Sequence, residues 1–131
     1  LRRSNPRSAA EWLERHATAP RSLVINGYPT VDFYFRDFDF TYIGLDNQRY
    51  WAYSCQRGTV DRWSNLPLLN DAAGLDEQIA RYDRTFIVTD TPSREKLMQD
   101  LDGWRPRVAW TSRDGYISIL AIDSRSTGVT R

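Results

Sequence analysis

The sequence predicts a small Rossmann-like α/β sandwich whose mixed sheet ends in an antiparallel β-hairpin over residues 107–122. Three observations predict this fold class. A helical pattern precedes a short apolar run at 22–26, a second apolar run at 85–89 precedes another helical pattern, and an Asp114-Gly115 turn signal lies between two β-branched segments. Such alternation of helices and strands favours a sheet with helices packed against it.

The first third of the chain predicts one helix and one strand. The run Ser8-Ala9-Ala10-Glu11 fits a capping box, in which a serine oxygen accepts from a free amide and a glutamate reaches back. We therefore expect a helix over about 9–17, ended by Pro20. The β-branched run at 22–26 is typical of a buried strand, and Gly27 ends it.

The middle of the chain carries weaker signals. Pro29 suits the first position of a short helix over about 30–36, and aromatic residues favour a second strand over 40–45. Residues 54–74 have many turn-forming residues and little periodicity, which predicts a long loop. An apolar face then predicts a helix over about 75–82.

The last third is the most regular part of the sequence. A strand is predicted over 85–89, and Thr91-Pro92 is typical of an N-cap followed by proline at the first helical position. The apolar stripe of this helix continues until Gly103. The segments 107–111 and 116–122 flank the turn signal and predict the final antiparallel pair.

Composition excludes several classes of protein. The chain has 131 residues, of which 40% are apolar, and this composition is typical of one ordinary soluble domain. A net charge of +1 creates no broad positive potential that would attract polyanions, so we expect no nucleic-acid partner. No apolar run of about 18 residues could span a bilayer. The single cysteine, Cys55, and the single histidine, His16, cannot supply a structural zinc site, and we expect no cofactor.

We expect three parts in the chain. Residues 1–7 are a linker or juxtamembrane segment, residues 8–123 are a single α/β domain, and residues 124–131 are a flexible tail. The chain begins at Leu1 rather than at methionine and has no signal-peptide pattern there. We therefore expect a longer polypeptide that continues upstream.

Acidic and hydroxyl side chains suggest two candidate sites. Asp37-Phe38-Asp39 has the carboxylate pair with which sugar-nucleotide transferases hold a divalent metal, and a surface turn is the alternative. Asp90 and Thr91 follow strand 85–89 at the start of a helix, where open α/β sheets bind ligands. Because no glycine-rich loop is present, a helix cap at Thr91 is the alternative.

A belt of nine aromatic residues, interleaved with aspartates, lies between residues 31 and 53. Aromatic faces stack on sugar rings, so ligand contacts are expected at Tyr50, Trp51 and Tyr53. The alternative is that the belt packs into the core.

No catalytic residue is predicted. His16 could act as a general base and Cys55 as a nucleophile, but no nucleophile motif such as Gly-x-Ser-x-Gly accompanies either residue. We expect His16 instead to cap the C-terminus of the first helix, where the partial negative charge favours a cation.

Three segments of the chain carry a resemblance to a known family. The first runs from Ala9 to Asn26, with a helix, a prolyl break and the strand Leu-Val-Ile-Asn. The second is Arg84 to Val88, and the third is the closing strand from Gly115 to Leu120. Together they resemble the soluble C-terminal domain of bacterial membrane glycosyltransferases of the GT-C class, which include protein mannosyltransferases and aminoarabinose transferases.

This resemblance implies a parent glycosyltransferase that takes its sugar from a polyprenyl-phosphate donor, with its catalytic aspartate outside this chain. The chain would be a non-catalytic domain on the extracytoplasmic (periplasmic or cell-surface) face of the membrane, helping to shape donor or acceptor access. Its partners would be the membrane domain of the same polypeptide and a glycan or lipid-linked sugar. Two alternatives are a free-standing carbohydrate- or peptide-binding module that uses the belt at 33–53, and a small metal-dependent transferase that uses Asp37 and Asp39.

Overall fold

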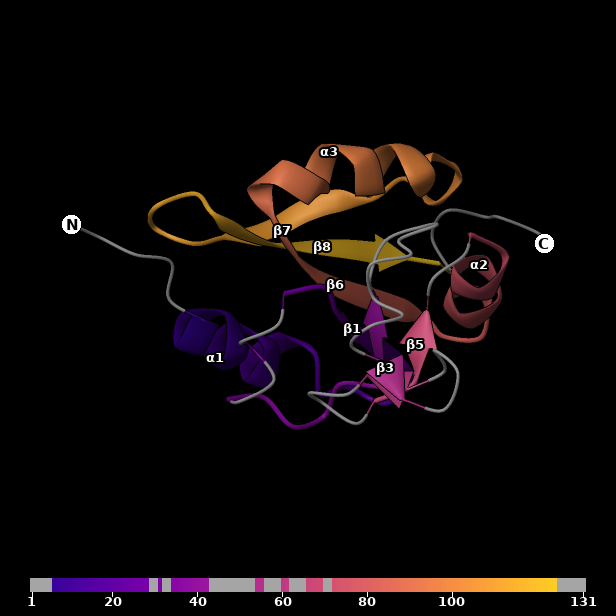
Figure 1. Ribbon diagram of the computed structural model, residues 1–131, viewed down its shortest axis with the longest axis horizontal. Helices are drawn as coiled ribbons and strands as arrows, with labels where there is room; N and C mark the ends of the chain where they lie inside the picture. The colour runs from indigo at the N-terminus through magenta and orange to yellow at the C-terminus, as the bar shows by residue number, and fades with distance from the viewer. Residues whose placement is uncertain are drawn as a thin grey trace.

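A mixed β-sheet with helices on both of its faces forms the centre of the molecule (Figure 1). The structure is a computed structural model that describes residues 6–28, 31, 34–42, 54–55, 60–61, 66–69 and 72–124. In chain order the elements are α1 (Pro6–His16), β1 (Ser22–Asn26), β2 (Phe40–Tyr42), β3 (Ser54–Cys55), β4 (Val60–Asp61), β5 (Leu68–Leu69), α2 (Ala72–Ala80), β6 (Arg84–Asp90), α3 (Thr91–Asp100), the 3-10 helix η4 (Asp102–Trp104), β7 (Arg107–Thr111) and β8 (Ile117–Asp123).

Six of the strands form one sheet in the order β5-β2-β1-β6-β8-β7. The first four run parallel, and β8 is antiparallel to both β6 and β7. Strands β3 and β4 pair separately as a short antiparallel ladder. The predicted mixed α/β sheet and its closing antiparallel hairpin are thereby confirmed.

The chain leaves the two central strands in opposite directions. Strand β1 continues to β2 on one side, whereas β6 continues through α3 to β7 on the other, and β8 returns between β6 and β7. The carboxyl ends of β1 and β6 therefore form a topological switch point, the place where open α/β sheets leave a crevice.

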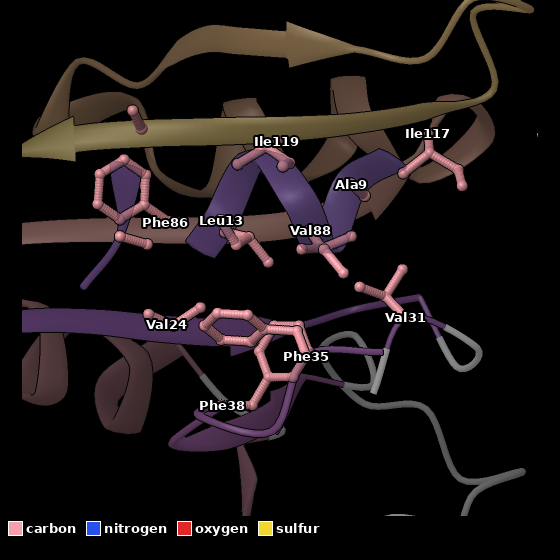
Figure 2. Packing of buried hydrophobic residues seen from close by; sticks show 13 residues of the cluster. Ala9, Leu13, Val24, Val31, Phe35, Phe38, Phe86, Val88, Ile117 and Ile119 are labelled. Atoms are coloured by element: carbon pink, nitrogen blue, oxygen red, sulfur yellow. The ribbon is translucent and has the colours of Figure 1, made fainter. Parts of the chain in front are cut away.

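Helix α1 covers one face of the sheet with a narrow apolar stripe. Ala9 and Leu13 of the helix, and Ala17 directly after it, recur at intervals of four residues, and all three are buried. They pack against Val24, Val31, Phe35, Phe38, Phe86, Val88, Ile117, Ile119 and Ala121. Figure 2 shows this cluster, with Phe35 and Phe38 beside Val24 of β1.

Helices α2 and α3 and the turn η4 cover the other face. Their buried residues meet the opposite side of the same strands, in a cluster that includes Leu23, Ile25, Leu75, Ile79, Ile87, Leu97, Leu101, Trp104, Leu120 and Ile122. Successive residues of a strand point to opposite faces. The unbroken apolar runs in β1, β6 and β8 are therefore strands that are buried on both faces.

The capping box predicted at Ser8 is wrong. Helix α1 begins at Pro6, so Ser8 lies inside the helix rather than at its N-cap. Proline is well tolerated in a first turn because the amide that it lacks would have no helical partner there. The helix ends at His16, where the amide of Ala17 still donates to the carbonyl of Leu13 at 2.7 Å.

The middle of the chain is described in part, and it differs from the prediction over residues 54–74. Of the helix expected over 30–36, the structure describes Val31 and residues 34–36, where the amides of Tyr34 and Phe35 donate to the carbonyl of Val31. The loop expected over 54–74 contains the short strands β3, β4 and β5 and the start of α2. Two-residue strands carry no periodic pattern, because they are defined by their partners rather than by their own sequence.

Candidate functional site

The polar side chains at the switch point form hydrogen bonds with backbone groups of the protein. The Oδ1 atom of Asp90 accepts from the amide of Ser93 at 2.9 Å and caps α3. The prediction that Thr91 is the N-cap is therefore wrong, since Thr91 lies one residue later. Its hydroxyl donates instead to the carbonyls of Gly115 and Tyr116 and ties α3 to the β7–β8 loop.

The residues at the end of β1 and directly after it also form hydrogen bonds at this end of the sheet. The amide of Gly27 donates to the carbonyl of Val88 at 2.7 Å, and Oδ1 of the buried Asn26 accepts from the amide of Tyr28 at 3.1 Å. The ring of Tyr28 meets that of Tyr116 edge to face, with centroids 6.0 Å apart. These contacts give each of the residues a structural role, and ligand binding at Asp90 and Thr91 stays a prediction.

The aspartates Asp37 and Asp39 lie beside β1 and flank the buried Phe38. The Oδ2 atom of Asp39 accepts from the amide of Val24 at 2.9 Å. Burial raises the pKa of the Asp39 carboxyl above its ordinary value of 3.8, the Val24 hydrogen bond lowers it, and the charge of Asp37 raises it again. Within the described segments, no group of three or more His, Cys, Asp or Glu side chains gathers to hold a metal ion.

The aromatic belt is represented mainly by core residues where the structure describes it. Phe35 and Phe38 are 2% and 5% exposed and pack edge to face at 5.0 Å, whereas Tyr34 is exposed and has the guanidinium of Arg7 over its ring at 5.1 Å. Core packing therefore accounts for Phe35 and Phe38. The predicted ligand contacts Tyr50, Trp51 and Tyr53 lie outside the described residues.

His16 and Cys55 have separate places in the fold. Nδ1 of His16 lies 2.9 Å from the carbonyl oxygen of Trp12, one turn earlier in α1. That carbonyl precedes the last four of the helix, so a C-terminal cap by His16 stays a prediction. The ring of His16 also stacks on the indole of Trp12, with centroids 4.1 Å apart. Cys55 belongs to the short strand β3, and its side chain lies outside the described part of the structure.

A pocket that the sequence did not predict lies at the opposite end of these strands, where β6 begins. Its volume is about 420 Å³, and residues of α1, β6, β7 and β8 line it: Trp12, His16, Arg84, Phe86, Arg107 and Ala121. Among the described residues of the lining, Asp123 is the one that carries an acidic group. Aromatic walls and two guanidinium groups are thus combined in a hollow large enough for a small molecule.

Strand register brings the sheet residues of this pocket together. Phe86 of β6 and Arg107 of β7 are both paired with Ala121 of β8. These three residues are far apart in the chain, so neither spacing nor composition marks them as neighbours. The hairpin signal at Asp114-Gly115 is the single indication in the sequence that β7 and β8 pair.

The chain has no match among known proteins in three comparisons. No protein-family model matches it, and no curated protein or solved structure does so significantly. Nor does any helix in the described segments have the length and apolar character needed to cross a bilayer.

Proposed function

We propose that the chain is a non-catalytic, extracytoplasmic domain of a membrane glycosyltransferase that uses polyprenyl-phosphate sugars. In this proposal the domain helps to shape the entrance for the donor or the acceptor, and the chemistry belongs to the membrane domain of the same polypeptide. The proposal starts from three segments that resemble the soluble domain of such enzymes: Ala9 to Asn26, Arg84 to Val88, and Gly115 to Leu120.

The observation that carries the proposal is the position of these three segments in the fold. They contain most of α1, all of β1, most of β6 and the first half of β8. Strand β6 lies between β1 and β8 and pairs with both, and α1 packs over the three strands. The resemblance thus falls on one contiguous structural unit at the centre of the sheet, which supports a shared fold.

The arrangement of the sheet suits a rigid accessory domain. Both faces of the central strands are buried under helices, and the polar groups at the switch point are hydrogen-bonded to one another. A scaffold of this kind holds its surface loops in fixed positions. An accessory domain that borders a substrate entrance needs this property more than it needs reactive side chains.

Protease accessibility in the native cell tests the location. Spheroplasts are treated with an external protease, and an antibody raised against residues 72–124 follows the fragment. We expect the epitope to sediment with the membrane and to be digested in intact spheroplasts, while a cytoplasmic marker survives. An epitope that remains in the soluble fraction, or that resists external protease until the cells are lysed, would contradict the proposal.

A turnover assay tests the absence of chemistry in this domain. The purified 131-residue chain is incubated with polyprenyl-phosphate sugars, and release of the sugar is measured. The proposal predicts no release above the level of a boiled sample. Conversion of any such donor by the isolated chain would overturn it.

A further inference from the structure

The pocket beside α1 exists because a small side chain lies between two large ones. Ala121 on β8 is paired with Phe86 on one side and with Arg107 on the other, and a methyl group cannot fill the space between them. Trp12 and His16, in the last two turns of helix α1, line the pocket beside this row. The resulting volume of about 420 Å³ falls within the range of about 300–1,000 Å³ that is typical of small-molecule sites.

One wall of the pocket is held rigid by aromatic contacts. The indole of Trp12 is stacked on His16, with an interplanar angle of 15°, and meets the ring of Phe86 edge to face at 5.7 Å. A carbonyl oxygen only accepts hydrogen bonds, so Nδ1 of His16 must carry the hydrogen in its bond to the Trp12 carbonyl. A ligand that contacts this wall therefore finds ordered side chains, which lowers the entropic cost of binding.

The rim of the pocket carries two arginines on the same face of the sheet. Arg84 precedes Phe86 by two residues on β6, and Arg107 is paired with Ala121, so strand alternation directs both side chains toward the α1 face. Their strands are separated by β8, which places the two backbones on the order of 10 Å apart. Both guanidinium groups can therefore reach a single group held above Ala121.

The charge of these two arginines is not balanced within the described segments. Neither Arg84 nor Arg107 forms an ion pair with a described acid. Among its described residues, the lining sets two guanidinium groups against one carboxylate, that of Asp123, a formal balance of +1 with His16 counted as neutral. Guanidinium groups match the geometry of phosphate and carboxylate oxygens and bind them through paired hydrogen bonds.

From this geometry we propose that the pocket binds a small phosphate monoester that carries a flat ring. The phosphate lies between Arg84 and Arg107, above Ala121, and the ring lies against Trp12. A phosphate monoester carries nearly two negative charges at neutral pH, which suits two guanidinium groups better than a single carboxylate would. The inference rests on the pocket alone and is independent of the proposed membrane enzyme.

Calorimetry on the full chain with four probes tests the chemistry of the ligand. Phenyl phosphate is expected to bind with a dissociation constant on the order of 1 mM or lower. Inorganic phosphate lacks the ring and benzoate lacks the second charge, so each is expected to bind about tenfold more weakly; phenol is expected not to saturate. Failure of phenyl phosphate to bind, or equal or tighter binding of any other probe, would overturn the proposal.

Matched arginine variants test the place of binding. Arg84→Gln and Arg107→Gln each remove one charge from an exposed rim position and are expected to weaken phenyl phosphate binding about tenfold or more. Arg113→Gln removes the same charge from an exposed residue of the β7–β8 loop, at the far end of the hairpin, and is expected to leave binding unchanged. Equal losses in all three variants would show general charge attraction and would overturn the site.

Filling the pocket provides a test that does not depend on charge. Ala121→Leu places a larger side chain in the row between Phe86 and Arg107, and it is expected to abolish the binding of phenyl phosphate while the far-UV circular dichroism is retained. Folded Ala121→Leu protein that binds as the parent does would contradict the proposed position. If this variant does not fold, the two rim variants decide the question.

Discussion

The carboxylate of Asp39 accepts the hydrogen bond from the Val24 amide that the carbonyl of a neighbouring strand would otherwise accept. The amide of Val24 donates to Oδ2 of Asp39 at 2.9 Å, and the amide of Asp39 donates back to the Val24 carbonyl at 2.8 Å. The regular ladder between β1 and β2 begins one residue later, at Ile25 and Phe40. Asp39 therefore extends the pairing of β2 with β1 by using its side chain.

This arrangement gives a pH-dependent prediction for Asp39→Asn. The pKa of the Asp39 carboxyl is raised above 3.8, mainly by burial, so the folded state holds the proton to a higher pH than the unfolded state does. The stabilisation that comes from this difference in proton binding is present below pH 3.8, and it is lost as the pH rises through the raised pKa of Asp39. The asparagine side chain retains an acceptor for the Val24 amide and does not ionise. We therefore expect the variant to gain stability relative to the parent as the pH rises through the raised pKa of Asp39.

Urea unfolding of both proteins between about pH 3 and pH 7 measures this difference. Asp37→Asn is the matched control, because it removes a nearby charge from an exposed residue while leaving the Val24 hydrogen bond in place. It is expected to change the pH dependence in the same direction but by less. A stability difference between parent and Asp39→Asn that does not vary with pH would contradict this account.

Thr85→Val is expected to stabilise the fold by about 1 kcal/mol. The hydroxyl of Thr85 is fully buried in β6 and has no hydrogen-bond partner, and valine has nearly the same shape without the polar atom. The control is Thr89→Val on the same strand, where the hydroxyl lies 3.4 Å from the carbonyl of Asp90 and the change is expected to be neutral or destabilising. Equal losses of stability in both variants would refute the prediction.

Gly27→Ala is expected to destabilise the fold by about 2 kcal/mol or more. A Cβ atom at Gly27 would lie 2.6 Å from the carbonyl oxygen of Val88, a backbone atom that is itself fixed by the Gly27 amide. Gly115→Ala is the comparison, because Gly115 has a φ of +80° but open space around it, and a loss of about 1 kcal/mol is expected. Thermal unfolding of both variants checks the order, and a larger loss at Gly115 would contradict it.

Trp104→Phe is expected to cost about 2–4 kcal/mol of unfolding free energy. Trp104 is 2% exposed, and its indole nitrogen donates to Oδ1 of Asp76 at 2.8 Å, which joins η4 to α2. The change removes both the hydrogen bond and part of the buried volume. Asp76→Asn keeps an acceptor and should cost less than about 1 kcal/mol. Equal losses in the two variants would show that the indole volume is not the larger contribution.

The regular elements could be predicted where the sequence alone determines them. Strands β1 and β7 match the expected ranges, and β6 is one residue longer at each end, because these short apolar or β-branched runs fit little else than a strand. The cap of α3 could not be assigned in the same way. Asp90 and Thr91 are both good N-cap residues, and only the hydrogen bond to Ser93 distinguishes them.

The candidate sites are harder to predict than the fold for a physical reason. Asp37, Asp39, Asp90 and Thr91 stand out by residue type, which cannot tell a ligand contact from a structural hydrogen bond. The pocket depends on which residues face each other across β6, β8 and β7, and on where α1 ends. Tertiary register of this kind is set by the whole sheet, so no local pattern at Arg84 or Ala121 reveals it.

Reading the coding sequence upstream of the codon for Leu1 tests the central claim most directly. For a domain of a membrane glycosyltransferase we expect a series of apolar segments, each of about 20 residues, encoded in the same frame. A start codon near Leu1, with no such segments in the polypeptide, would contradict it.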